Sequence, residues 1–428
     1  MTTKQYPSLS EQVHTHIAPN GLTIKIVPRP GFTKKLVYFA TDFGSIHRHF
    51  EFEGKEYYVP AGIAHFLEHK MFELPGRDVT GEFAALGANV NAFTSYDMTA
   101  YYFSCTEHFE ENLSLLLEFV STPYFPEESV RREMGIIDQE IGMNRDAPDS
   151  RVFEDLMKIL YREHPIQVPI LGNEETIREI TPELLEVCHR AFYTPQNMIL
   201  CLVGDVDMDV VSQVVDRVLG KQRKPMGKKL TAWQETMTAR ESQCHNTMEV
   251  AMPTFQMAFK CEPIGMGQEA MRGEIVGDLA AEALFGESSP LYLELYQKGM
   301  IDSSFGGGFE SVDGCAMLTC GGDSQNPEHI REAILGSVHR LLENGLSQGD
   351  FLRMKRSAMG RRIQQLDSFD STCFRMCAYH FQGFDYFDFP QVYAQVTQEE
   401  IGEFLQRTVL QERCALSIIY PKEELANE

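Results

Sequence analysis

The chain has 428 residues, of which 43% are hydrophobic and 23% charged, and its formal net charge at pH 7 is −24. This length suits two domains of about 200 residues, each able to bury a core without disulfides or a structural metal. The negative charge argues against nucleic acid and anionic membranes as partners, because both repel an acidic surface.

Ten cysteines are scattered along the chain without a C-x-x-C pair, which indicates a reducing compartment rather than a disulfide framework. The opening residues, MTTKQYPSLSEQ, lack the apolar stretch of a signal peptide. No run approaches the roughly 18 apolar residues of a membrane-spanning helix. The sequence therefore predicts a soluble, cytoplasmic protein.

The first half of the sequence alternates predicted strands and helices. Asn20-Gly21 is a favoured hairpin turn, and it separates the strand-like stretches 13–18 and 22–27. Further strands are predicted at 36–43, 88–93, 99–105 and 198–203. Helices are predicted at 61–72, directly after Pro60, and at 110–121, 126–144, 151–161 and 182–191.

A change of character between residues 221 and 247 predicts a linker. Lysine and arginine residues cluster there with Pro225 and Gly227, and no apolar period holds. The predicted domains are therefore 1–220 and 248–428. In the second domain, strands are predicted at 248–251 and 415–420, glycine-rich strands and turns around 306–308 and 321–322, and helices at 269–285, 290–298, 327–343 and 347–366.

The order of elements in the second half roughly echoes that in the first. Strands mixed with segregated helices favour an α+β fold. We therefore expect two similar domains, each a largely antiparallel sheet packed with helices.

The helix predicted at 61–72 carries an H-x-x-E-H motif. His65 and His69 are four residues apart, so a helix presents both imidazoles to one ion. Zinc in a peptidase needs three protein ligands and an open position for water. Glu68 is placed to take a proton from that water and need not be a ligand. The alternative is that these are ordinary polar residues on a helix, but bulky apolar neighbours such as Phe66 predict burial, and buried histidines need partners.

A third ligand has to come from elsewhere in the chain. In the helix predicted at 126–144, Glu133 and Glu140 are seven residues apart and share a face. Acidic residues on helices are usually solvated, which we expect for Glu127 and Glu128. A solvated role is less favoured for Glu140, because isoleucines flank it.

With these residues, the sequence resembles the pitrilysin/insulinase family of zinc peptidases, and most closely the bacterial two-domain members that are encoded as pairs and resemble mitochondrial processing peptidase subunits. That family has H-x-x-E-H and, roughly 70 to 80 residues later, a helical glutamate preceded seven residues earlier by another. GANVNAFTS at 87–95 and YTPQNMILCLVGDVD at 193–207 extend the likeness. The resemblance implies a Zn²⁺ ion bound by His65, His69 and Glu140, with Glu68 as the base and Glu133 supporting a ligand histidine.

The resemblance also implies where substrate binds. In the family, the stretch that corresponds to Asn91, Ala92, Phe93 and Thr94 is a sheet edge to which a peptide adds as a strand. An edge offers unpaired backbone groups and binds peptides with little regard to sequence. The alternative role of Phe93 as a core residue is compatible with this one.

The second half departs from the family pattern. Self-sufficient members carry an arginine and a tyrosine there that polarise the substrate carbonyl. This chain has Tyr296 where the arginine is expected and Asp302 about where the tyrosine is expected. An ionised aspartate cannot donate to an oxyanion. We therefore expect a homologous partner chain to supply the missing groups.

The resulting expectation is a zinc endopeptidase that hydrolyses peptides or unfolded segments as the metal-bearing subunit of a heterodimer. The alternative is a non-catalytic peptide-binding or structural subunit of a peptidase-like complex. Two other patterns are not expected to be sites. The pair Cys373 and Cys377 is assigned to helix packing, for want of a fourth ligand, and the triplet 306–308, which lacks the lysine and the following serine or threonine of a P-loop, is expected to be a turn or a close-packing site.

Overall fold

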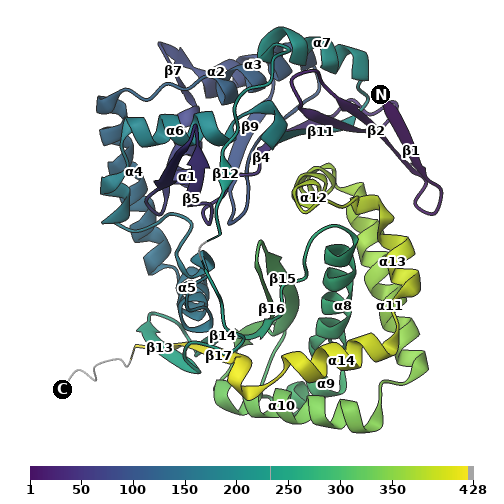
Figure 1. Ribbon diagram of the computed structural model, residues 1–428. Helices are drawn as coiled ribbons and strands as arrows, with labels where there is room; N and C mark the ends of the chain where they lie inside the picture. Colours follow the sequence, from purple (N-terminus) through teal and green to yellow (C-terminus); the bar gives the residue numbers. More distant parts are fainter. Residues whose placement is uncertain (232, 423–428) are drawn as a thin grey trace. The chain divides into compact units, whose positions relative to one another are not determined.

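The computed structural model describes residues 1–231 and 233–422, and these form two compact units (Figure 1). The first unit comprises Met1–Ile141, Pro169–Ala232 and Ile363–Asp388. The second unit comprises Gly142–Val168, Trp233–Arg362 and Phe389–Glu428. Each unit therefore contains segments from both halves of the chain.

The first unit is built on a seven-stranded sheet with the order β1-β2-β3-β11-β4-β10-β9. Neighbouring strands are antiparallel, except for the parallel pair β3 and β11. The strands are β1 Thr2–Tyr6, β2 Glu11–Ile17, β3 Thr23–Pro28, β4 Lys35–Thr41, β9 Asn89–Thr94, β10 Thr99–Cys105 and β11 Met198–Gly204. Smaller sheets join β5 His49–Phe52, β6 Lys55–Tyr58 and β12 Lys228–Lys229, and separately β7 Glu73–Leu74 and β8 Arg77–Asp78.

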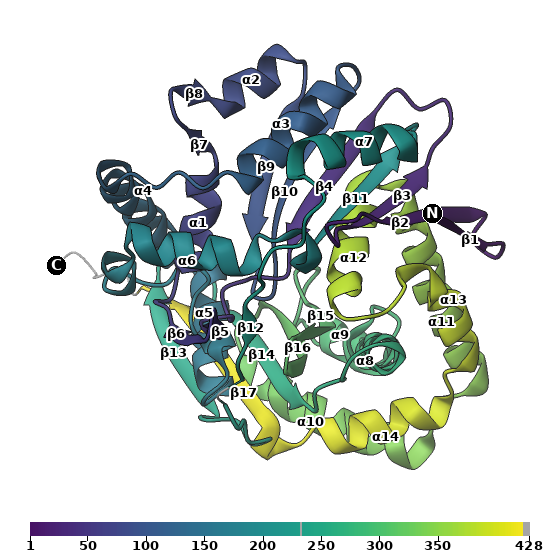
Figure 2. The same cartoon turned by 45° about the horizontal axis from the view of Figure 1, so that its top comes forward.

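Helices cover both faces of this sheet, which explains why every residue of β11 is buried. Helix α3 contacts β4 and β10, and α12 contacts β4 and β11 from the opposite face (Figure 2). The helices of this unit are α1 Ile63–Met71, α2 Val79–Ala85, α3 Phe109–Ser121, α6 Pro182–Phe192, α7 Met208–Leu219 and α12 Phe369–Phe381, and α4 Glu127–Asp146 belongs to it up to Ile141.

The second unit repeats this arrangement with a five-stranded sheet in the order β13-β17-β14-β16-β15. As in β3-β11-β4-β10-β9, the first pair is parallel and the others are antiparallel. The strands are β13 Gln243–Met248, β14 Thr254–Cys261, β15 Gly306–Val312, β16 Cys315–Asp323 and β17 Cys414–Pro421. The helices are α5 Pro148–Leu160, α8 Gln268–Phe285, α9 Pro290–Gln297, α10 Pro327–Asn344, α13 Phe389–Gln395 and α14 Gln398–Thr408, with most of α11 Gln348–Gln364.

The α+β class and the two similar, largely antiparallel sheets are thus confirmed. The units differ from the contiguous stretches 1–220 and 248–428 because each sheet is covered by a helix from the other half of the sequence. Helix α5 contacts β14 and β17, and α12 contacts β4 and β11. Both helices are short amphipathic segments, and their local sequence does not indicate which sheet they cover.

The stretch 221–247, predicted to be a linker, contains secondary structure. Its lysine pair Lys228–Lys229 forms β12 and pairs with β5, and its last residues belong to β13, which pairs with β17. The strand predicted at 248–251 is misplaced. Only Met248 lies in a strand, as the last residue of β13, and residues 249–251 connect β13 to β14, which begins directly after Pro253.

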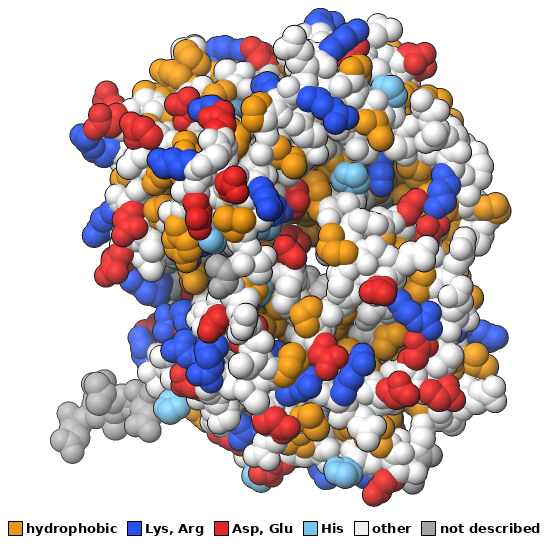
Figure 3. Space-filling view, in the orientation of Figure 1, with side chains coloured by type: hydrophobic (Ala, Val, Ile, Leu, Met, Phe, Trp, Pro, Cys, Tyr) orange, Lys and Arg blue, Asp and Glu red, His pale blue; other side chains and the backbone are white. Residues whose placement is uncertain are grey.

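Charged side chains of both signs are mixed with apolar ones over the face shown in Figure 3. Among the described residues, no helix combines the length and apolar character needed to cross a bilayer.

Candidate metal centre

Helix α1, which carries the predicted motif, begins where only glycine fits. Gly62 precedes it with φ at 90°, and a Cβ there would lie 2.5 Å from the carbonyl oxygen of Leu171. The body of the helix is buried, including His65 and Glu68. Gly62 therefore sets where α1 begins, and the residues of the helix itself are mostly buried in the first unit.

The three predicted ligands lie together. Nε2 of His65 is 3.6 Å from Oε2 of Glu140, and Nε2 of His69 is 3.7 Å from the same oxygen. One donor atom from each of the three residues lies within 4.8 Å of the others. Helix α1 supplies the histidines, and α4 supplies the glutamate.

These separations fit a shared ion better than direct hydrogen bonds. Atoms bound at about 2.0–2.2 Å in tetrahedral geometry stand roughly 3.3–3.6 Å apart, whereas a hydrogen bond between nitrogen and oxygen is shorter. Burial, with a smaller effect of His69, lowers the pKa of His65 to about 3. The imidazole is therefore neutral, which is the form that binds a metal.

Glu133 lies on the far side of the His69 ring. Its Oε1 is 3.0 Å from Nδ1 of His69, while Nε2 of the same ring faces Glu140. Burial alone would lower the pKa of His69, but the hydrogen bond to Glu133 and the surrounding carboxylates raise it. A proton held on Nδ1 by Glu133 leaves Nε2 available to an ion.

Glu68 is buried beside these residues, with 8% of its surface exposed. Burial raises the pKa of its carboxyl, and a hydrogen bond from Thr94 partly opposes that rise. The Thr94 hydroxyl donates to Oε2 of Glu68 over 2.6 Å. In the part of the chain that the structure describes, no group donates a hydrogen bond to Oε1.

Strand β9, which holds Asn91, Ala92, Phe93 and Thr94, is the last strand of its sheet. Among the described residues no further strand pairs with its outer side, although the amide of Ala92 donates to Oδ1 of Asn91 over 2.8 Å. Thr94 points toward Glu68, whereas the ring of Phe93 lies 5.7 Å from that of Phe374. The half-buried Phe93 accordingly contributes to packing as well as to the edge.

Two family models match the chain: one described as insulinase (peptidase family M16) over residues 55–174, and one described as the peptidase M16 inactive domain over 179–358. A Bacillus subtilis protein named an uncharacterized zinc protease, YmfH, is 36% identical over 98% of this chain and 99% of its own length. This chain belongs to the insulinase (M16) family of peptidases. The five predicted metal-site residues all lie within the range of the first M16 model.

Two solved structures are similar to this chain over most of its length. An M16-like peptidase from Alicyclobacillus acidocaldarius has a TM-score of 0.92 and 32% identity, covering 96% of this chain and 99% of its own. A protease from Helicobacter pylori has a TM-score of 0.82 at 19% identity, covering 96% of this chain and all of its own. The second likeness supports the fold alone.

The two positions singled out in the second unit do not hold the expected arginine and tyrosine, but Tyr296 and Asp302. Tyr296, on α9, is 54% exposed and stacks on Tyr292 at 5.9 Å. Asp302 accepts hydrogen bonds from the amide and hydroxyl of Ser304, which lower its pKa. The aspartate is therefore an ionised turn residue.

The residues assigned to packing do pack. Cys373 and Cys377 are fully buried on α12, where Sγ of Cys373 lies 3.8 Å from the carbonyl oxygen of Cys201. In β15, a Cβ on Gly307 would lie 2.4 Å from the ring of Phe285. The triplet lies in a strand rather than in a turn, and its middle glycine is required for close packing.

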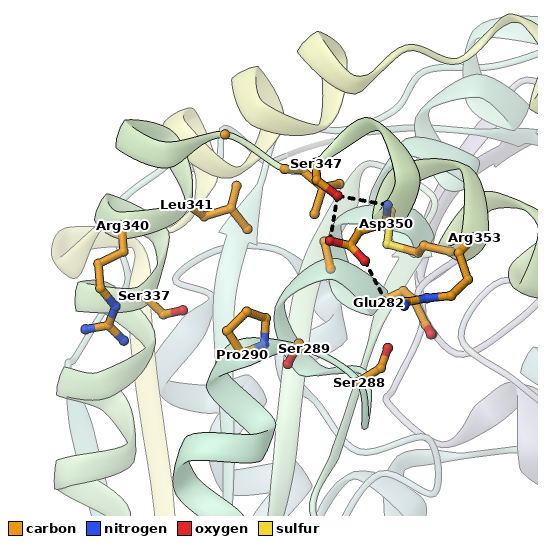
Figure 4. Close-up of a pocket in the computed structure, with 14 residues that line it drawn as sticks. Glu282, Ser288, Ser289, Pro290, Ser337, Arg340, Leu341, Ser347, Asp350 and Arg353 are labelled. Atoms are coloured by element: carbon orange, nitrogen blue, oxygen red, sulfur yellow. Dashed lines mark hydrogen bonds and ion pairs between the residues drawn. The ribbon is translucent and has the colours of Figure 1, made fainter.

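A cavity of about 320 Å³ lies in the second unit between the ends of α8, α9, α10 and α11 (Figure 4). Its charged residues are already paired, as in the 3.0 Å contact between Arg353 and Asp350. None of the predicted site residues lines it. The candidate centre is therefore the cluster on α1 and α4.

Proposed function

We propose that this M16-family protein is a zinc endopeptidase that hydrolyses peptides or unfolded segments. The observation that supports this most directly is the convergence of His65, His69 and Glu140, with the unengaged Oε1 of Glu68 beside them. The name of the Bacillus subtilis relative, a zinc protease, favours zinc as the ion. An ion held there would act as a Lewis acid that lowers the pKa of a water molecule and polarises a carbonyl.

The protein's own residues would perform the remaining steps. Glu68 would accept the proton of the attacking water and pass it to the leaving amine. Glu133 would hold the His69 ring with Nε2 directed at the ion. The outer edge of β9 would align the peptide backbone beside these groups.

Binding through an edge strand sets the class of substrate. Backbone hydrogen bonds to β9 require an extended peptide, which a folded domain offers only in loops and ends. The proposed substrates are therefore peptides and unfolded segments, bound with limited dependence on sequence.

We propose further that a homologous chain completes the centre with an arginine and a tyrosine. The support is that Tyr296 stands in the place of the expected arginine, and that Asp302 is an acceptor engaged with Ser304. A developing oxyanion needs donors or positive charge. The hydroxyl of Tyr296 can donate but does not bring the positive charge of an arginine, and Asp302 stands where a tyrosine donor is expected.

The test is zinc reconstitution. Protein stripped of metal by a chelator is titrated with Zn²⁺, and both bound zinc and hydrolysis of a quenched peptide are measured. Hydrolysis should appear in step with one equivalent of bound zinc. Stoichiometric zinc binding without hydrolysis, with and without the homologous chain, would instead favour the non-catalytic alternative.

A further inference from the structure

The hydroxyl of Thr94 has one proton, and the surrounding contacts show where it goes. Thr94 is the last residue of β9 and lies opposite Thr99 on β10. The hydroxyl of Thr99 is 3.5 Å from that of Thr94, but it has a better acceptor in the carbonyl oxygen of Phe43 at 2.9 Å. The Thr94 proton therefore belongs to the 2.6 Å hydrogen bond with Oε2 of Glu68.

The position of Thr94 is set by the turn that follows it. The amide of Ser95 donates to the carbonyl of Met98 over 2.8 Å, and the carbonyl of Ser95 accepts from the amide of Ser45. The amide of Ile46 donates to the carbonyl of Tyr96 over 3.0 Å. These bonds hold the end of β9 against residues 44–46.

A glycine permits this close approach. At Gly44, a Cβ would lie 2.5 Å from the backbone of Tyr96, so any larger residue would displace the turn. The backbone that carries the Thr94 hydroxyl is therefore constrained on two sides, by β10 and by the segment at Gly44.

We propose that Thr94 is a positioning residue that fixes the orientation of the Glu68 carboxylate. With Oε2 engaged by Thr94, the carboxylate cannot rotate freely, and Oε1 is the oxygen left to accept a proton. This inference rests on the proposed peptidase function. It also links two parts of that site, because the same strand offers its edge to the substrate and holds the base.

The test uses variants that separate the hydroxyl from the shape of the side chain. Thr94→Val keeps the branched shape but removes the donor, and Thr94→Ser keeps the donor. We expect Thr94→Val to lower kcat about 10- to 100-fold, the usual cost of losing a group that orients a metal-site residue. KM and bound zinc should stay unchanged, and Thr94→Ser should restore most of kcat.

The second unit offers a matched control. Thr254, on β14, donates to Oδ1 of Asp323 over 2.6 Å, which is the same type of bond between a strand threonine and a carboxylate. Thr254→Val should leave kcat and KM unchanged. Thermal unfolding of each variant shows whether it is folded, and Thr94→Ala serves as a second donor-free variant if Thr94→Val is not.

A second measurement does not depend on turnover. A peptide hydroxamate offers an acidic O–H to the base, whereas the matching peptide thiol binds through sulfur and does not. In the zinc-loaded protein, Thr94→Val should weaken hydroxamate binding about 10-fold, the loss expected for one charge-assisted hydrogen bond. Thiol binding should not change.

Each result has a definite meaning. A wild-type kcat in Thr94→Val, or equal losses in Thr94→Val and Thr94→Ser, would overturn the positioning role. If wild-type protein with bound zinc does not hydrolyse peptides, the proposed function fails, and the comparison of the two inhibitors still decides whether Thr94 orients Glu68.

Discussion

Glu133 and Glu140 lie on opposite sides of one imidazole ring, with Glu133 3.0 Å from Nδ1 of His69 and Glu140 3.7 Å from Nε2. Seven residues on a helix make about two turns, roughly 10.5 Å of rise. That length allows two glutamates on α4 to face one ring from both sides. The two carboxylates therefore have different roles, although their side chains are identical.

Replacing each glutamate separately should show this difference. Glu140→Gln removes a charged oxygen that binds the ion and should weaken zinc binding by more than about 100-fold. Glu133→Gln should reduce zinc affinity about 10- to 100-fold. Competition with a coloured chelator measures both affinities. Glu127→Gln, whose exposed carboxylate pairs with Arg131 on the same helix, is the control and should bind zinc normally. Equal affinities for the two site variants would mean that the third ligand has been misidentified.

Glu68→Gln should abolish hydrolysis while zinc stays bound. The amide has the size of the carboxylate but cannot accept the proton of the attacking water, and a lost general base costs about 10²- to 10⁴-fold in rate. Bound zinc is measured by elemental analysis and hydrolysis by initial rates, both on the same preparation. Zinc lost together with activity would show that Glu68 is a ligand or a structural residue.

A homologous chain that carries the arginine and tyrosine should raise turnover by the lone chain. Removing one oxyanion donor typically costs about 10²- to 10³-fold in kcat, so a gain of that order is expected on saturation. A second copy of this chain brings the same Tyr296 and Asp302 and should not substitute. Turnover of a quenched peptide is followed while the partner is titrated in. A full rate without the partner, together with a rate that does not change when the partner's arginine and tyrosine are mutated, would disprove the proposal that a second chain completes the site.

The second unit contains a carboxylate whose contribution to stability depends on pH. Glu235 accepts hydrogen bonds from the amides of Arg162, Glu163 and His164 and from the buried ammonium of Lys260. Burial alone would raise its pKa, but these bonds lower it from 4.5 to about 2. Breaking such a buried pair should reduce the free energy of unfolding by about 3 kcal/mol at neutral pH in Glu235→Gln.

The pH dependence follows from the direction of that shift. Because the folded-state pKa lies below the unfolded value, the stabilisation is fully present above pH 4.5 and is lost as the pH falls toward 2. The difference between wild type and Glu235→Gln in urea unfolding should therefore narrow over that interval. Glu241→Gln is the control, since its exposed 3.7 Å pair with Arg240 should contribute under about 1 kcal/mol. A difference that is constant with pH would contradict this account.

Local sequence was sufficient where neighbouring residues determine structure. The Asn20-Gly21 turn predicted the hairpin of β2 and β3, and the histidine spacing in α1 predicted that His65 and His69 converge. The separation of Glu133 from Glu140 likewise placed both on one face of α4.

Long-range packing was not predictable in this way. Nothing near Thr94 in the sequence shows that its hydroxyl meets Glu68, because that contact depends on how β9 packs against α1. The strand at Gln243–Met248 was missed because its pairing with β17 joins residues more than a hundred positions apart. A polar strand of this kind has a weak local signature, and its partner decides its structure.

The exchange of helices between the two halves constrains the order in which the chain can fold during synthesis. The sheet of the first unit needs α12 to cover β4 and β11, and α12, Phe369–Phe381, lies far beyond both strands in the sequence. Until the ribosome has made those residues, an apolar face of a nearly complete sheet stays uncovered. The candidate catalytic unit therefore cannot close its core before α12 has been synthesised, and a fragment ending near residue 220 should aggregate rather than fold.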